Sequence, residues 1–114
     1  MNPWSLMLIL IAVVLLSIGQ VLFKIAANSL SDIRIETLFN PVLLLALAIY
    51  GVATILWIIS LRSVPLRLAY PFFGLAFVCV PLMAHLVLSE PLKWSTFIGA
   101  AFILVGVWIS VALD

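Results

Sequence analysis

One lysine inside a long apolar stretch is the first residue of this sequence that could do chemistry. Lys24 shares a helical face with Ser17 and Gln20, at 100° per residue. A fixed positive charge beside an amide and a hydroxyl suits an anionic group such as a phosphate or a carboxylate. Alternatively, Lys24 lies near enough to the end of the stretch to extend its amine to water.

Aromatic side chains form a second group at helical spacing. Between residues 41 and 61, Tyr50 and Trp57 fall on one face; between residues 66 and 88, Tyr70 lies near one face, with Phe73 at its edge. Together they predict a slot lined by aromatic rings. The alternative is that Trp57 and Tyr70 belong to the aromatic belt of a membrane interface.

Further ionisable residues lie where the apolar stretches end. Arg62 and Arg67 flank a short turn and are further candidates for holding a phosphate, which arginine binds with two parallel hydrogen bonds. His85 favours a hydrogen bond at the interface over proton transfer. Three roles are open for Glu90: it closes the next turn, it pairs with Lys93, or it receives an amine of a substrate.

Acidic residues are missing from the apolar stretches. Asp32, Glu36, Glu90 and Asp114 all fall in connections or at the end of the chain. A transporter that is coupled to protons, or that binds a hydrophobic cation, usually carries a carboxylate at membrane depth. The sequence also lacks a nucleotide-binding loop and a catalytic constellation. We therefore expect no enzyme, no cofactor and no metal site.

The composition identifies the elements that must position these residues. The chain has 114 residues, of which 68% are hydrophobic and 8% charged, with a net charge of +1 and a mean hydropathy of +1.46. So few charged side chains cannot cover the surface that a soluble domain of this size exposes. A soluble enzyme, a nucleic-acid binder and a disordered segment are thereby excluded.

Four stretches are long and apolar enough to cross a bilayer, which takes about 20 residues of helix. They predict an all-α membrane protein with a single domain over residues 1–114 and four transmembrane helices, at about 4–27, 41–61, 66–88 and 95–113. The two short turns force antiparallel neighbours. The longer polar connection, residues 28–40, could form a short interfacial helix. This topology puts Arg62 and Arg67 on the side of both termini and Lys24 on the other side.

Four thin helices enclose little volume, so we expect a homodimer or a heterodimer with a similar subunit. Gly99 and Gly106 recur after seven residues on the last helix, where small residues let another helix approach closely. Packing within one chain is an equally good explanation of this spacing.

Four short segments resemble the small four-helix members of the drug/metabolite transporter superfamily, and the resemblance covers nearly the whole chain. The segments are GQVLFK at 19–24, VPLRLAYP at 64–71, LSEP at 88–91 and GAAFILVGV at 99–107. In the small multidrug resistance branch, an essential glutamate stands three residues before the glycine of helix one. This chain has Leu16 there, which argues against proton-coupled export of cations.

The sequence is more similar to the branch of small flippase subunits for aminoarabinose-phosphoundecaprenol. That resemblance implies a small-multidrug-resistance-like bundle in the bacterial inner membrane, which flips an undecaprenyl-phosphate-linked sugar for lipid A modification. Lys24, Arg62 and Arg67 would then address the phosphate, and the sugar and groove would be served by Ser17, Gln20, Tyr50, Trp57, Tyr70 and Phe73. The alternatives are a small-molecule or cation exporter and a non-transporting accessory subunit.

Overall fold

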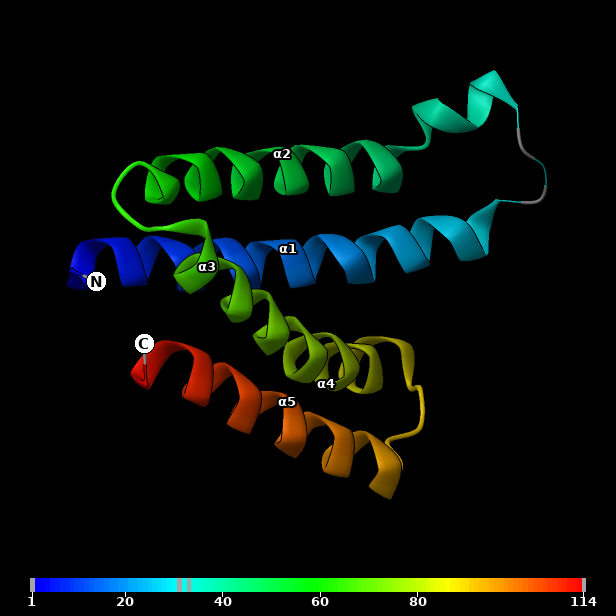
Figure 1. The fold of residues 1–114 in the computed structure, drawn as a ribbon. Helices are drawn as coiled ribbons and strands as arrows, with labels where there is room; N and C mark the ends of the chain where they lie inside the picture. Colours follow the sequence, from blue (N-terminus) through cyan, green and yellow to red (C-terminus); the bar gives the residue numbers. More distant parts are fainter. Residues whose placement is uncertain (1, 31, 33, 114) are drawn as a thin grey trace.

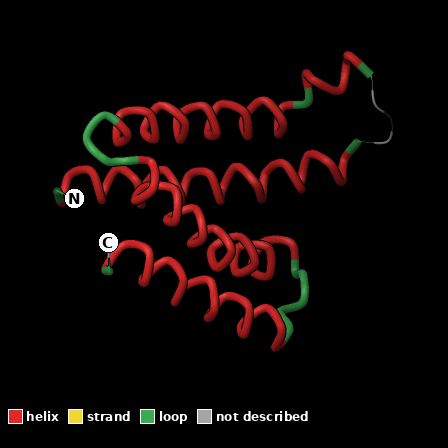
Figure 2. The backbone as a smooth tube through the Cα atoms, in the orientation of Figure 1, coloured by secondary structure: helices red, strands yellow, loops and turns green. Residues whose placement is uncertain are grey.

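The computed structural model describes residues 2–30, 32 and 34–113, and helices make up nearly all of this part of the chain. Its long helices are α1 (Pro3–Ser29), α2 (Pro41–Leu61), α4 (Ala76–Leu88) and α5 (Trp94–Ala112), shown in Figures 1 and 2. Together with a short α3 (Leu66–Ala69), α4 completes a third span over Leu66–Leu88. All four spans are long and apolar enough to cross a membrane. The bounds predicted from the sequence differ from these by at most two residues.

Asparagine followed by proline begins both of the first two spans. The Oδ1 atom of Asn2 accepts a hydrogen bond of 2.7 Å from the backbone N–H of Ser5. The Oδ1 atom of Asn40 likewise accepts from Val42 at 2.9 Å. Each cap satisfies a backbone donor that a helix start leaves free, and the proline that follows has no such donor to satisfy.

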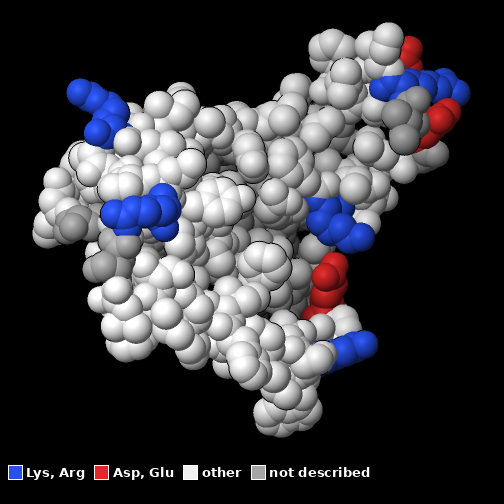
Figure 3. Space-filling model, in the orientation of Figure 1, with Lys and Arg blue, Asp and Glu red and all other residues white. Residues whose placement is uncertain are grey.

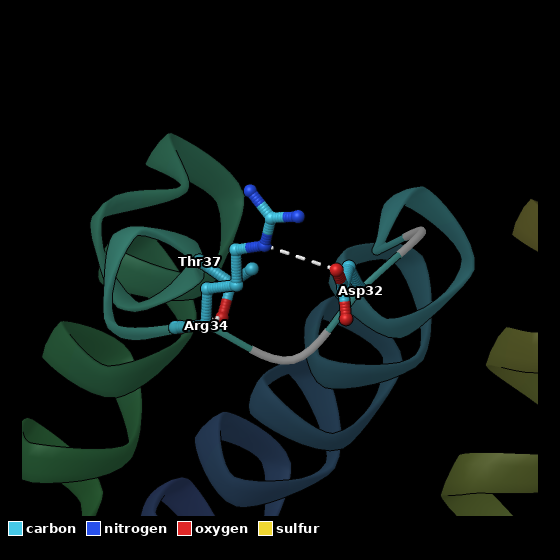
Figure 4. A network of polar contacts seen from close by, with 3 residues as sticks. All are labelled: Asp32, Arg34 and Thr37. Atoms are coloured by element: carbon cyan, nitrogen blue, oxygen red, sulfur yellow. Dashed lines mark hydrogen bonds and ion pairs between the residues drawn. The ribbon is translucent and has the colours of Figure 1, made fainter.

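The polar connection between α1 and α2 contains the short helix that the sequence predicted, a 3₁₀ helix η1 over Ile35–Phe39. Before η1, the Nε of Arg34 donates to the Oδ2 of Asp32 at 2.9 Å (Figure 4). Within η1, the hydroxyl of Thr37 donates back to the carbonyl of Arg34. The side-chain amide of Asn40 donates to the hydroxyl of Ser29, which joins the end of α1 to the start of α2.

The third span is where the fold departs most from a plain helix. Between α3 and α4, residues Tyr70–Leu75 form a 3₁₀ helix, η2, which is narrower and longer per residue than an α-helix. Pro71 lies in η2 and Pro81 lies inside α4. Each proline lacks an N–H, so one carbonyl of the preceding turn loses its usual partner. The apolar pattern of residues 66–88 predicts one continuous helix, and it does not indicate a 3₁₀ segment.

Helix α1 is the central element, and it packs along α2 and against α4. Its small residues face the chain's own interior: Ala12, Gly19 and Ala26 are buried, and Gly19 lies against the ring of Tyr50. These three small residues of α1 therefore pack within the chain.

The main core cluster lies near the end of the bundle that holds both termini (Figure 1). It is formed by Ile9, Val13, Val64, Ala69 and Phe72. Helix α5 packs on η2 and α4 and has no buried residue. A whole flank of α5 is therefore open.

Candidate functional site

An open groove of about 480 Å³ runs between α1 and the third span. Leu16 and Gln20 of α1 form one wall, and the other wall carries aromatic and apolar side chains: Tyr70, Phe73, Ala76, Phe77, Val80 and Pro81. Gln20 and Tyr70 are the lining residues with polar side-chain groups. The groove can therefore accept a mainly apolar molecule that carries a few hydrogen-bonding groups.

A smaller cavity of about 130 Å³ adjoins the groove. Leu16 and Phe73 line both spaces, so they stand at the boundary between them. The remaining walls of the small cavity come from α1 and α2: Ala12, Tyr50, Ala53, Thr54 and Trp57. The two hollows thus form one track along α1.

Three aromatic rings connect the groove with the small cavity. The ring centroids of Trp57 and Phe73 lie 4.4 Å apart, and those of Phe73 and Tyr70 lie 5.3 Å apart with an edge-on arrangement. These contacts confirm the predicted juxtaposition of aromatic residues from the second and third spans. Such a set of ring faces and edges can pack against the C–H groups of a sugar ring or an isoprene unit.

Lys24 is exposed and lies one helical turn beyond Gln20, toward the end of α1. It does not line the groove itself. A lysine in this position can bring its flexible amine to the mouth of the groove, while the rest of its side chain stays along apolar surface.

Ser17 does not reach the groove, contrary to the polar stripe expected from the sequence. Its side chain is fully buried, and its hydroxyl donates to the carbonyl of Val13 at 2.8 Å. A serine that bonds to its own helix in this way has no free donor for a ligand. The polar row of α1 is therefore Gln20 and Lys24.

Arg62 and Arg67 lie at the opposite end of the bundle from Lys24. Basic side chains occur at both ends of the molecule, and the face between them carries no charged residue among those described (Figure 3). Arg62 lines a separate cavity between the start of α1 and the α2–α3 turn, whereas Arg67 is exposed and does not line that cavity. Since Lys24 and Arg62 are separated by the length of α1, they cannot hold the same phosphate.

His85 and Glu90 meet in the turn after α4. The Nδ1 atom of His85 lies 2.8 Å from the carbonyl oxygen of Glu90, and the N–H of Glu90 donates to the carbonyl of Ala84. Ser89 between them has the left-handed φ of 56° that ends the helix. This matches the expected interfacial hydrogen bond of His85 and the turn-closing position of Glu90. Among the described residues, no ion pair joins the carboxylate of Glu90 to Lys93.

Residues 4–112 match the EamA-like transporter family. The chain belongs to this family. It is 31% identical to the probable 4-amino-4-deoxy-L-arabinose-phosphoundecaprenol flippase subunit ArnF of Proteus mirabilis, over 83% of this chain and 82% of that protein. It is also 31% identical to the probable flippase subunit ArnE of Pectobacterium atrosepticum, over 92% of this chain and 96% of that protein. The ArnE subunit of an Escherichia coli strain is 43% identical over 57% of this chain and 59% of that protein.

No solved structure matches this EamA-like chain. Its four apolar spans and its relatives agree on a multi-pass membrane protein. The relatives above are named as probable flippase subunits, and these names favour transport over catalysis.

Two groups of residues in this EamA-like bundle were not predicted from the sequence. Thr54 lines the small cavity, and its position between Tyr50 and Trp57, four and three residues away, could have revealed it. Ser5 and Ser63 lie 58 positions apart, and their hydroxyls form a hydrogen bond of 2.6 Å beside Arg62. No local spacing in the sequence indicates that contact.

Proposed function

We propose that this chain is a subunit of a flippase that moves 4-amino-4-deoxy-L-arabinose-phosphoundecaprenol across the bacterial inner membrane. The observation that carries the proposal is the groove between α1 and the third span, with Gln20 in its wall and Lys24 one turn beyond. The named relatives suggest the substrate class, and the groove, the small cavity beside it and Lys24 each suit one part of that substrate.

The phosphodiester carries one negative charge and meets the Lys24 end of the groove. Phosphate is held there by the lysine amine, with the amide of Gln20 as a neutral donor next to it. No acidic side chain lies in the described spans or lines the groove, so the walls of the groove do not repel an anion. A hydrophobic cation would find no counter-charge at this depth.

The sugar occupies the small cavity at the inner end of the track. There it meets the rings of Trp57 and Phe73 and the hydroxyls of Tyr50 and Thr54. Thr54 already donates to the carbonyl of Tyr50 at 2.9 Å, so its oxygen remains an acceptor for a sugar hydroxyl or amine. The first isoprene units lie along Phe77 and Val80, and the rest of the tail stays in lipid.

Two subunits form the working transporter, as a homodimer or as a heterodimer with a similar four-helix chain. Support comes from α5, which has no buried residue. A Cβ atom added to Gly99 or Gly106 of this helix would meet nothing within 4 Å. A second helix can therefore approach this flank closely. The curated relatives are themselves named as subunits.

Lipid titration of the purified protein, followed by native mass spectrometry, tests the proposal. Wild type should retain the aminoarabinose lipid in preference to phosphatidylglycerol, and Lys24→Gln should weaken that binding about tenfold or more, since a hydrogen bond to a charged group contributes about 1.5–3 kcal/mol. Lys93→Gln is the matched control, because Lys93 is an exposed lysine at the same end but precedes α5, whereas Lys24 lies one turn from Gln20 on α1.

Three results would contradict the proposal. If wild type binds and translocates no polyprenyl-phosphate lipid while a known flippase does so in the same assay, the substrate class is wrong. Saturable binding of tetraphenylphosphonium instead would indicate a cation exporter. A large copurifying partner without any bound lipid would indicate an accessory subunit.

A further inference from the structure

The cavity at the other end of the bundle has the features of a second lipid-phosphate site. It measures about 340 Å³ and lies between the first turns of α1 and the α2–α3 turn. Its polar lining comes from Asn2, Ser5, Arg62 and Ser63, and its apolar lining from Trp4, Leu8 and Ile59. These lining residues include no acid.

The hydrogen bond between Ser5 and Ser63 fixes the shape of this cavity. It joins α1 to the turn that carries Arg62, and Ser5 is only 2% exposed. A pair of hydroxyls holds two hydrogens and uses one of them in its mutual bond, so one O–H remains available as a donor. Arg62 adjoins this pair in the sequence and adds a guanidinium, which has no acidic partner among the described residues.

The lining favours a lipid phosphate over a free one. Guanidinium, hydroxyl and amide donors suit the phosphate oxygens. Leu8 and Ile59 offer nothing to an inorganic ion, but they suit the first carbon atoms of a lipid chain. Trp4, which is 61% exposed, is an aromatic residue of the kind enriched at the membrane surface.

The spacing between the two cationic ends is close to the thickness of a membrane. At 1.5 Å per residue, the helix from Ser5 to Lys24 covers about 28 Å, and the hydrocarbon core of a bilayer is about 30 Å thick. Arg62, beside the first turn of α1, and Lys24, near its end, therefore lie at levels that match the two interfaces of a bilayer. A lipid whose phosphate moves between leaflets must leave one of these levels and arrive at the other.

We infer that the Arg62 cavity receives the lipid phosphate in one leaflet and that the Lys24 end receives it in the other. This inference rests on the proposed function. The chain then has two phosphate sites at the two ends of one transport path. The aromatic track lies between them and accommodates the polar head in transit.

Titration of the full chain with undecaprenyl phosphate, read by native mass spectrometry, counts the sites. Wild type should bind two molecules of the lipid per chain. Lys24→Gln and Arg62→Gln should each bind one molecule, and the double variant should bind none. Each substitution should weaken the affinity of its own site for the lipid phosphate about tenfold or more. Arg67→Gln is the matched control, since Arg67 is an exposed arginine at the same end and lies outside the cavity. It should behave as wild type, and Arg62→Lys should restore part of the binding.

Two competing ligands separate the possible sources of the phosphate. Phosphatidylglycerol and inorganic phosphate are each titrated against bound undecaprenyl phosphate, and neither should displace it at equal concentration. The inference is wrong if Arg62→Gln still binds two molecules, or if the substitution reduces only the binding of phosphatidylglycerol or of inorganic phosphate. In those cases the Lys24 site, and with it the proposed function, still stands. Loss of all polyprenyl-phosphate binding by wild type would instead reject the proposed function.

Discussion

Leu16 of α1 and Phe73 of η2 line the same two hollows from opposite elements, so this pair forms the boundary between the groove and the small cavity. An apolar contact at this point leaves the track uncharged. It also makes the pair a sensitive place to alter what the track accepts.

Leu16→Glu should weaken binding of the aminoarabinose lipid about tenfold or more, because a carboxylate beside the track repels the phosphodiester and is costly to desolvate. The substitution alone should not create export of cations, since the surrounding walls remain shaped for a sugar and an isoprene. Lipid titration and growth on ethidium measure the two effects. Leu16→Gln is the uncharged control. An equal loss in both variants would show that the shape of the side chain matters and its charge does not.

Trp57→Ala should lower affinity for the aminoarabinose lipid about threefold to tenfold while leaving undecaprenyl phosphate nearly unaffected. The indole packs on Phe73 in the small cavity, and an aromatic contact of this kind contributes about 0.5–1.5 kcal/mol. Parallel titrations with the two lipids isolate the contribution of the sugar. Trp94→Ala, at an exposed indole outside both hollows, serves as control. If Trp57→Ala weakens both lipids equally, the sugar does not occupy this cavity.

Gly74→Ala should destabilise the docking of α5 on η2 by about 1–3 kcal/mol, the usual range for overpacking. A Cβ atom at this position would lie 2.8 Å from Cγ2 of Val107 and 3.0 Å from Cγ2 of Ile103. Thermal unfolding in detergent measures the change. Gly51→Ala is the control, since a Cβ there meets nothing within 4 Å and the helix gains up to about 1 kcal/mol of propensity. Similar midpoints for the two variants would mean that α5 moves aside without strain.

Gly106→Leu should dissociate the dimer if a second subunit packs on the glycine flank of α5. Ala101→Leu adds bulk to an exposed position about 140° around the same helix, and it should leave the dimer intact. Cross-linking in native membranes, before and after each substitution, reports the association. A dimer that survives Gly106→Leu, or that is lost only in Ala101→Leu, would place the interface on another surface.

The four spans were predictable because length and hydropathy alone define a helix in lipid, where the backbone has no other way to satisfy its hydrogen bonds. The 3₁₀ segment η2 was not, because neither the length nor the hydropathy of residues 66–88 distinguishes it from an α-helix. Tyr50, Trp57, Tyr70 and Phe73 were placed together correctly by their helical spacing. Each of these rings needs only to lie on the inner side of its own helix for that prediction to hold.

The polar residues of α1 were harder to place. Ser17 and Gln20 lie only about 60° apart around a helix, so a small rotation decides which one is buried against its own turn and which one faces the groove. The pairing of Ser5 with Ser63 depends on the arrangement of three elements. Arg62 was grouped with Lys24 by charge type, although the alternation of the spans already put the two at different faces.

The 3₁₀ segment also makes the third span respond to the thickness of the bilayer. Its six residues, Tyr70–Leu75, rise about 2.0 Å each in place of 1.5 Å, which adds about 3 Å to the length of the span. A span longer than the hydrocarbon core tilts, and this one runs obliquely across α1 in Figure 1. A thicker membrane would decrease the tilt of this span, and a thinner membrane would increase it. Either change alters the wall of the groove that Tyr70 and Phe73 form. Acyl-chain length in the host membrane should thus tune the rate of transport without any change in the protein.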